Sequence, residues 1–211
     1  MNVQAGICAD PNMHALYLML NRTGDASQLA ARLAKLATLW HSVSADFPEA
    51  NFSGLVAIGS QAWCDLYPHA RPPELEDFAA QSANGHSAPH TPFDLFVQLR
   101  AERVDVLHHA GHRLLALLAG YVELVEEVRG FRNLDMRDLT GFVDGTENPQ
   151  GGRKQEVALV AEGHFAGGSY IHVQRWIHNM CDWERLSQKE QEDIIGRTKV
   201  DNIEYLSLIH I

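Results

Sequence analysis

Apolar side chains recur along the first part of the chain in short runs and at helical spacing. The run His14–Leu20 (HALYLML) is short and almost wholly apolar, which is typical of a buried strand. Asp25 and Ser27 are residue types that favour helix N-caps, and apolar residues follow them at helical spacing: Leu29, Leu33, Leu36 and Trp40. The pattern therefore predicts a strand followed by one helix.

Three more strands and a second helix are expected before residue 130. The strands are Ser53–Ile58 (SGLVAI), Asp94–Leu99 (DLFVQL) and Tyr121–Val128, and a loop rich in Pro, His and Gly runs from Pro68 to Pro92. One apolar helix face precedes the last strand: Val104, Leu107, Gly111, Leu114 and Leu118. The order β-α-β-β-α-β is the split arrangement of a ferredoxin-like domain. The fold class is therefore predicted as α+β, with a first domain over residues 1–140.

The pattern begins again after Pro149. Glu156–Ala161 is a candidate strand, and Gly168–His178 alternates apolar and polar positions. Ser187–Glu190 has the form of a capping box, which opens a helix that should stop at Gly196. These elements predict the start of a second ferredoxin-like domain over residues 141–211, which stays incomplete within the sequence.

Composition narrows the classes of function. Lys and Arg number 17 against 27 Asp and Glu, so the formal net charge is -10, which disfavours nucleic acid as a partner. We expect no membrane span, because the apolar runs are too short, and no secretion signal. Cys8, Cys64 and Cys181 are widely separated, so a cytoplasmic location without disulfides or a zinc-thiolate site is expected.

The segment Gly141–Pro149 (GFVDGTENP) holds the densest cluster of candidate chemistry. Asp144–Gly145 alone is typical of a tight turn, because both residues tolerate positive φ. A cation loop is a second interpretation, with oxygens from Asp144, Glu147 and Asn148, although the alternating acidic spacing of calcium loops is missing. A third is a carboxylate held close to a flat ligand, since glycines let the backbone approach it. Composition does not decide among these interpretations.

The same segment resembles the distal-side motif of dye-decolorizing peroxidases, which are haem proteins built from two ferredoxin-like domains. Three further segments stand in the order expected for that family: Gly167–Tyr170 (GGSY), Val173–Trp176 (VQRW) and Ile194–Lys199 (IIGRTK). The similarity runs from the first strand to about Lys199 and is greatest to the compact cytoplasmic branch.

The resemblance implies roles for particular residues. Asp144 matches the distal aspartate, which accepts a proton from hydrogen peroxide and returns it to the leaving oxygen. Gly145, Thr146 and Glu147 match the segment that lies against haem b, and Arg197 matches an arginine that reaches a haem propionate. The implied activity is a peroxidase that oxidises dyes, phenols or other aromatic donors, working as a homo-oligomer. Lys199 is expected only to complement the dipole of the preceding helix.

The resemblance also stops short of two functional residues. The proximal histidine and the distal arginine of the family follow the Gly-Arg-Thr-Lys segment, and the tail YLSLIHI does not match that region. We therefore expect both residues beyond residue 211, assign His210 no role and assign no metal ligand. The remaining candidates are interpreted as solvated histidines or packed aromatic residues: His108, His112, His172, His178, Tyr170, Trp176 and Trp183.

Two other functions remain open at this point. A haem carrier or iron-handling protein would keep the cofactor without turnover. A cofactor-free α+β module would act through oligomerisation alone.

Overall fold

The computed structural model describes residues 3–205 of the chain. The described residues divide between two compact units. The larger unit comprises Met1–Phe131 and Gly152–Ile171, and the smaller comprises Arg132–Gly151 and His172–Ile211. Residues 206–211, with His210, lie outside the described part.

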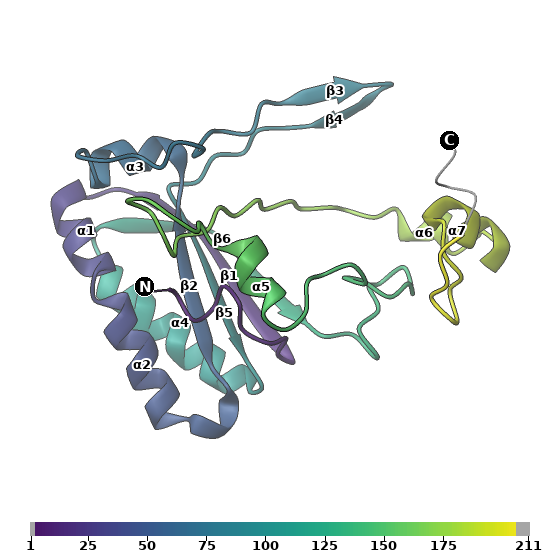
Figure 1. Cartoon of the computed structure of the whole chain (residues 1–211), viewed down its shortest axis with the longest axis horizontal. Coiled ribbons are helices and arrows are strands. Elements are labelled where there is room, and N and C mark those ends of the chain that lie inside the picture. Colours follow the sequence, from purple (N-terminus) through teal and green to yellow (C-terminus); the bar gives the residue numbers. More distant parts are fainter. Residues whose placement is uncertain (1–2, 206–211) are drawn as a thin grey trace. The chain divides into compact units, whose positions relative to one another are not determined.

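A four-stranded antiparallel sheet forms the centre of the larger unit (Figure 1). Its strands lie in the order β2 (Ser53–Ile58), β5 (Leu95–Ala101), β1 (His14–Arg22) and β6 (Val122–Phe131). This arrangement confirms the ferredoxin-like fold. The prediction began β5 and β6 one residue early. It ended β1 and β5 two residues early and β6 three residues early.

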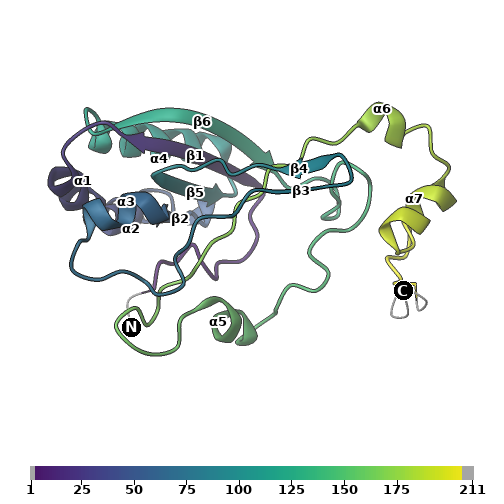
Figure 2. The same cartoon turned by 90° about the horizontal axis from the view of Figure 1, so that it is seen from above.

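Helices α1 (Ala26–Leu33), α2 (Leu36–Asp46) and α4 (Val104–Leu118) pack against the sheet (Figure 2). The single helix expected between Leu29 and Trp40 is two helices, because the chain makes a short turn in which Lys35 N–H donates to Arg32 O at 2.9 Å. Asp25 caps α1 as expected, since its side chain accepts from Gln28 N–H.

The core lies between the sheet and these helices. Alternate residues of β5 point into it, since Leu95, Val97 and Leu99 are all fully buried. Helix α4 approaches β1 closely at Gly111, where an added Cβ would lie 2.9 Å from Leu16 Cδ2. Large side chains from helix and strand fill the space between: Leu18, Leu20, Leu29, Leu114 and Leu118.

Between β2 and β5 the chain forms elements that the sequence reading left as loop. Helix α3 (Ser60–Leu66) follows β2 directly. The short 3-10 helix η1 (Pro48–Ala50) lies before β2. A small hairpin of β3 (Gln81–Ala83) and β4 (His86–Ala88) then projects from the unit (Figure 1). Its turn, Asn84–Gly85, has φ of 52° and 79°, the positive values that two-residue hairpin turns require.

Two predicted strands of the second repeat are wrong. The segment expected as strand Glu156–Ala161 begins inside helix α5 (Arg153–Ala158). The first residues of this helix, Arg-Lys-Gln-Glu, are all good helix formers. The alternating segment Gly168–His178 contains no strand, and no strand among residues 3–205 forms ladder hydrogen bonds with it. Its apolar side chains are exposed rather than buried, with Ile177 at 88%. Alternation without a partner strand does not make a sheet.

The smaller unit contains α6 (Met180–Trp183) and α7 (Gln188–Ile195). The predicted capping box is confirmed: Ser187 caps α7, and Glu190 Oε2 accepts from Ser187 N–H at 2.8 Å. The predicted stop is also confirmed, because Gly196 takes the left-handed conformation with φ of 79°.

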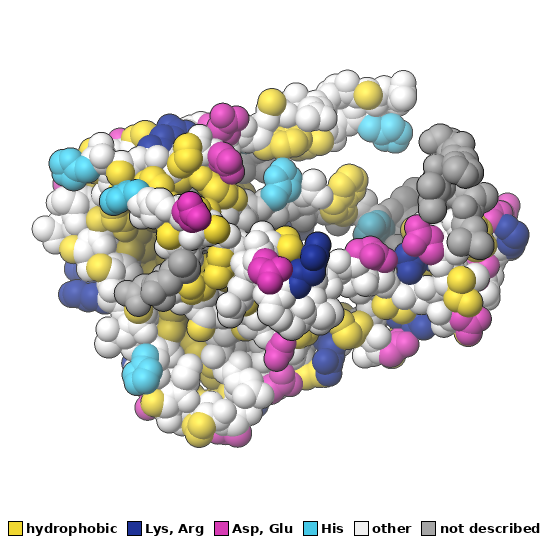
Figure 3. Space-filling view, in the orientation of Figure 1, with side chains coloured by type: hydrophobic (Ala, Val, Ile, Leu, Met, Phe, Trp, Pro, Cys, Tyr) yellow, Lys and Arg dark blue, Asp and Glu magenta, His cyan; other side chains and the backbone are white. Residues whose placement is uncertain are grey.

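The surface carries many charged side chains. Acidic and basic side chains lie interspersed on the face shown in Figure 3. Among the residues that the structure describes, no helix is long and apolar enough to cross a membrane.

Candidate functional site

The motif Gly141–Pro149 lies in the smaller unit, where the chain reverses direction and pairs with the preceding residues. Asp138 N–H donates to Phe142 O at 2.9 Å, and Asp144 N–H donates to Met136 O at 3.1 Å. An isolated bridge between Arg137 and Val143 lies between these two bonds. The backbone is therefore held by hydrogen bonds up to the aspartate itself.

Asp144 is exposed, and its two carboxylate oxygens differ. Oδ1 accepts from Gly145 N–H at 2.7 Å, which orients the carboxylate. Oδ2 has no partner among residues 3–205. The side chain is therefore positioned by the loop through one of its two carboxylate oxygens.

Gly145 begins a turn rather than lying at its centre. Its φ is 68°, and Asn148 N–H donates to Gly145 O at 3.1 Å. A Cβ at Gly145 would lie 2.6 Å from Asn148 Nδ2, so the conformation favours glycine and a larger residue would have to move the Asn148 side chain. Thr146 and Glu147 are exposed within this turn. The tight-turn interpretation of Asp144–Gly145 is therefore wrong in detail: only Gly145 of the two has positive φ, and the turn follows the pair rather than being formed by it.

Phe142 anchors the loop. It is 4% exposed and makes an edge contact with Trp183, with ring centroids 6.0 Å apart. Trp183 Nε1 in turn donates to Thr140 O at 3.0 Å. Lys199 lies with Nζ 5.5 Å from the centre of the Phe142 ring and 2.7 Å from Gln191 Oε1. The Lys199 side chain therefore packs on the base of the loop, a role beyond the helix-dipole effect expected for it.

Arg137 joins the two segments of the smaller unit. Its Nη1 donates to Gly141 O at 3.0 Å and also to Lys199 O, and Nη2 donates to Val200 O at 3.3 Å. Its Nε donates to Asp135 Oδ1, and this hydrogen bond lowers the pKa of Asp135. Sequence reasoning missed this arginine, because carbonyl acceptors have no side-chain signature.

Arg197 faces the motif from the turn that follows α7. Its Nε and Nη2 donate to Asn202 Oδ1 and Asn202 O, at 3.0 and 3.2 Å. Its Nη1 lies 3.4 Å from Glu204 Oε2 and 3.9 Å from Glu147 Oε1. The structure thus brings Glu147 of the motif and Arg197 into one cluster.

These residues fit the distal side of a haem and its propionates. Asp144 presents a free carboxylate oxygen, Gly145 has no side chain, and Nη1 of Arg197 already has carboxylates within 4 Å. Among the described residues, no group of three or more His, Cys, Asp or Glu that could hold a metal ion occurs. His172 and His178 lie in the same unit and are exposed.

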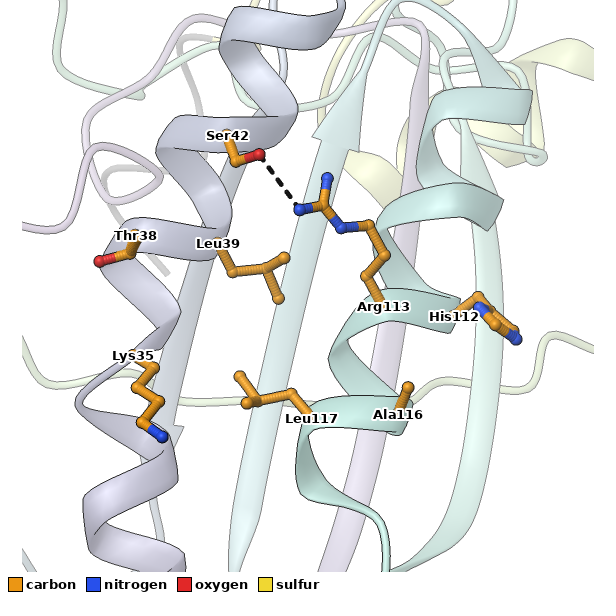
Figure 4. A pocket seen from close by; sticks show the side chains of 8 residues that line it. All are labelled: Lys35, Thr38, Leu39, Ser42, His112, Arg113, Ala116 and Leu117. Carbon is orange, nitrogen blue, oxygen red and sulfur yellow. Dashed lines mark hydrogen bonds between the residues drawn. The ribbon is translucent and has the colours of Figure 1, made fainter.

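The larger unit has a separate hollow between α2 and α4, with a volume of about 640 Å³ (Figure 4). Arg113 crosses it and donates from Nη2 to Ser42 Oγ at 3.1 Å. The hollow contains no residue of the motif. Its lining residues are Lys35, Thr38, Leu39, Ser42, His112, Arg113, Ala116 and Leu117.

The fold and the motif together define a class of protein. Residues 4–132 match the family model "Dyp-type peroxidase, N-terminal", and residues 135–207 match "Dyp-type peroxidase, C-terminal". The chain therefore belongs to the Dyp-type peroxidase family, and the resemblance is confirmed.

Individual relatives support this assignment. A dye-decolorizing peroxidase of Mycobacterium tuberculosis is 44% identical over 174 residues, which is 82% of this chain and 52% of the relative. A second, from Mycolicibacterium paratuberculosis, is 40% identical over 193 residues, or 90% of this chain and 54% of the relative. The chain thus spans about half the length of these curated relatives.

Solved structures give the same result. A putative Dyp-type peroxidase from Shewanella oneidensis superposes with a TM-score of 0.93 at 50% identity, over 97% of this chain and 67% of that one. A variant of DypB from Rhodococcus jostii RHA1, solved in complex with heme, gives 0.90 at 34% identity over 96% of this chain and 67% of that one.

Proposed function

We propose that this chain carries the N-terminal domain and the distal face of a haem b peroxidase. The enzyme would reduce hydrogen peroxide and oxidise dyes, phenols or other aromatic donors. The observation that carries the proposal is the carboxylate of Asp144, fixed through Oδ1 by Gly145 N–H and free at Oδ2. Its support is the family membership of the chain and the position of this aspartate in the matched motif.

Haem, when bound, supplies the iron at which peroxide reacts. Asp144 Oδ2 accepts the proton that hydrogen peroxide releases and returns it to the departing oxygen, which then leaves as water. Gly145 N–H holds the carboxylate through Oδ1, so the proton moves over a short and constant distance. Gly145, Thr146 and Glu147 would form the turn against the haem, and Arg197 would bind a propionate.

The proposal includes the organisation of the protein. We propose domains over residues 1–140 and 141–211, a cytoplasmic location and a homo-oligomeric state. Hydrogen peroxide and aromatic electron donors are the proposed partners.

Asp144→Asn tests the proposed mechanism. We expect a chain completed with the C-terminal segment of a relative such as the Shewanella oneidensis protein to bind haem equally with either residue. Loss of one general acid-base group costs about a hundredfold to ten-thousandfold in rate, so the reaction with peroxide in stopped-flow mixing should slow by that much. Asp201→Asn, also an exposed aspartate of the smaller unit, is the matched control. An unchanged rate in Asp144→Asn would remove Asp144 from the mechanism.

Haem binding without turnover is the second candidate function. A Soret absorbance of the chain without peroxide-dependent dye oxidation would support this carrier function, and dye oxidation would exclude it. Absence of a Soret band in both the chain and its completed form would exclude both candidates and leave the cofactor-free module.

A further inference from the structure

Arg197 has an unusual set of acidic neighbours. Its Nη1 faces two carboxylates from different segments, Glu204 at 3.4 Å and Glu147 at 3.9 Å. The side chain of Arg197 is only 22% exposed, whereas those of Glu204 and Glu147 are 56% and 86% exposed. A largely enclosed cation therefore faces two solvent-exposed anions.

The position of Glu204 follows from the turn after α7. Thr198 N–H donates to Ile203 O and Tyr205 N–H donates to Gly196 O, both at 2.9 Å. These bonds, with the bridge between Arg197 and Glu204, bring Glu204 back beside the guanidinium. The backbone of the turn thus holds a carboxylate next to Arg197 even when no ligand is bound.

The contact of Glu204 with Arg197 is weak. A strong arginine-carboxylate pair makes two parallel hydrogen bonds shorter than 3 Å. Here one oxygen lies 3.4 Å from Nη1, and Nε and Nη2 are already occupied by Asn202. An incoming carboxylate could therefore displace Glu204 without disturbing the bonds that position the guanidinium.

We propose that Glu204 is an internal competitor for the carboxylate-binding site of Arg197. It occupies Nη1 in the free protein and is displaced when a porphyrin propionate binds there. This inference rests on the proposed function, and it adds a regulation of the site: Glu204 weakens binding of ligands whose carboxylate must take its place on Nη1 of Arg197.

Binding of metal-free protoporphyrin IX to the 211-residue chain tests this proposal, because it needs no iron ligand and no turnover. Affinity is measured by the quenching of tryptophan fluorescence, and the dimethyl ester of the same porphyrin is the ligand without carboxylates. An exposed ion pair is worth about 0.2–1 kcal/mol, so Glu204→Gln should tighten diacid binding by up to about fivefold. It should leave ester binding unchanged.

Two further variants complete the design. Glu184→Gln removes the same charge from an exposed position of the smaller unit, and we expect no change in affinity. Arg197→Gln should abolish the preference for diacid over ester, and the effect of Glu204→Gln should shrink in high salt because exposed charges are screened.

The outcomes separate this inference from the proposed function. If Glu204→Gln binds the diacid no better than Glu184→Gln does, the competitor role is wrong while haem binding stands. If the wild-type chain binds diacid and ester equally, Arg197 is not a carboxylate site and the inference also fails. If no form binds either porphyrin, the inference and the placement of haem at this loop fall together.

Discussion

Replacing Gly141 by alanine should loosen the loop that carries Asp144. Gly141 has φ of 91°, and a Cβ there would lie 2.5 Å from Lys199 Cε and 3.1 Å from Lys199 Nζ. Backbone strain at such a φ costs about 1–2 kcal/mol. Moving Lys199 aside also breaks its 2.7 Å bond to Gln191 Oε1, which adds about 1–2 kcal/mol. The expected total is about 2–4 kcal/mol of local stability.

Hydrogen exchange at the Asp144 amide measures this loss, since that amide donates to Met136 O across the base of the loop. At 1.4 kcal/mol for each factor of ten, we expect exchange to accelerate by about 30-fold to 1,000-fold. Gly151→Ala is the matched control, because Gly151 also has positive φ, 57°, but no atom within 4 Å of an added Cβ. It should show the effect of strain alone at its own position.

A double-mutant cycle decides whether the Lys199 contact is the cause. In a Lys199→Ala background the clash is absent, so Gly141→Ala should cost only the strain of about 1–2 kcal/mol. If Gly141→Ala lowers the local stability by the same amount with and without the Lys199 side chain, the contact between Lys199 and position 141 does not contribute to the loss.

Two other predictions concern the core and the acid response. Leu18→Ala should destabilise the larger unit by about 2–5 kcal/mol, because Leu18 is 1% exposed in strand β1. Val104→Ala, at a 52% exposed position, is the control and should change the stability little. Urea unfolding measures both. The pKa of Glu192 is lowered, mainly because Lys199 N–H donates to its carboxylate and also because Gln188 does. Its contribution to stability is therefore present above its unfolded pKa of about 4.3 and lost as pH falls through the lowered value. The Lys199 amide shift should report that titration, and Glu192→Gln should remove it.

The sequence predicted the elements whose side-chain pattern matches their surroundings. Strand β5 was found because Leu95, Val97 and Leu99 alternate on a half-buried sheet, and α4 was found because its apolar face recurs every three or four residues. The capping box before α7 was found because its two bonds join residues three apart. In each case the determining interaction is local or periodic.

The elements that were missed depend on information that the pattern does not hold. Hairpin β3–β4 has the turn signal Asn84–Gly85, but its strands are short and exposed, so no apolar alternation marks them. The alternation of Gly168–His178 indicates a strand only where another strand is available to pair with it. Arg137 was missed because its acceptors are backbone oxygens as many as 63 residues away.

The two units are stabilised by different means, and this affects the site. Twenty or more buried apolar residues support the larger unit, whereas Phe142 is the one buried hydrophobic residue of the smaller unit in the described part of the chain. The rest of the smaller unit is held by polar contacts of Arg137, Glu192, Arg197 and Lys199. Segments with little buried apolar surface open at low free-energy cost.

The aspartate loop should therefore open independently of the sheet. A substitution such as Leu18→Ala acts on the larger unit, and Gly141→Ala acts on amides of the smaller one, so hydrogen exchange should locate each effect in its own unit. A ligand that binds Arg197 or contacts the loop would stabilise the smaller unit by mass action, because it adds contacts that the open form lacks. Hydrogen exchange in the loop and ligand affinity then both report the equilibrium between its closed and open forms. Glu204→Gln should change both together. If porphyrin binding left exchange at Asp144 unaltered, the loop and Arg197 would not form one site.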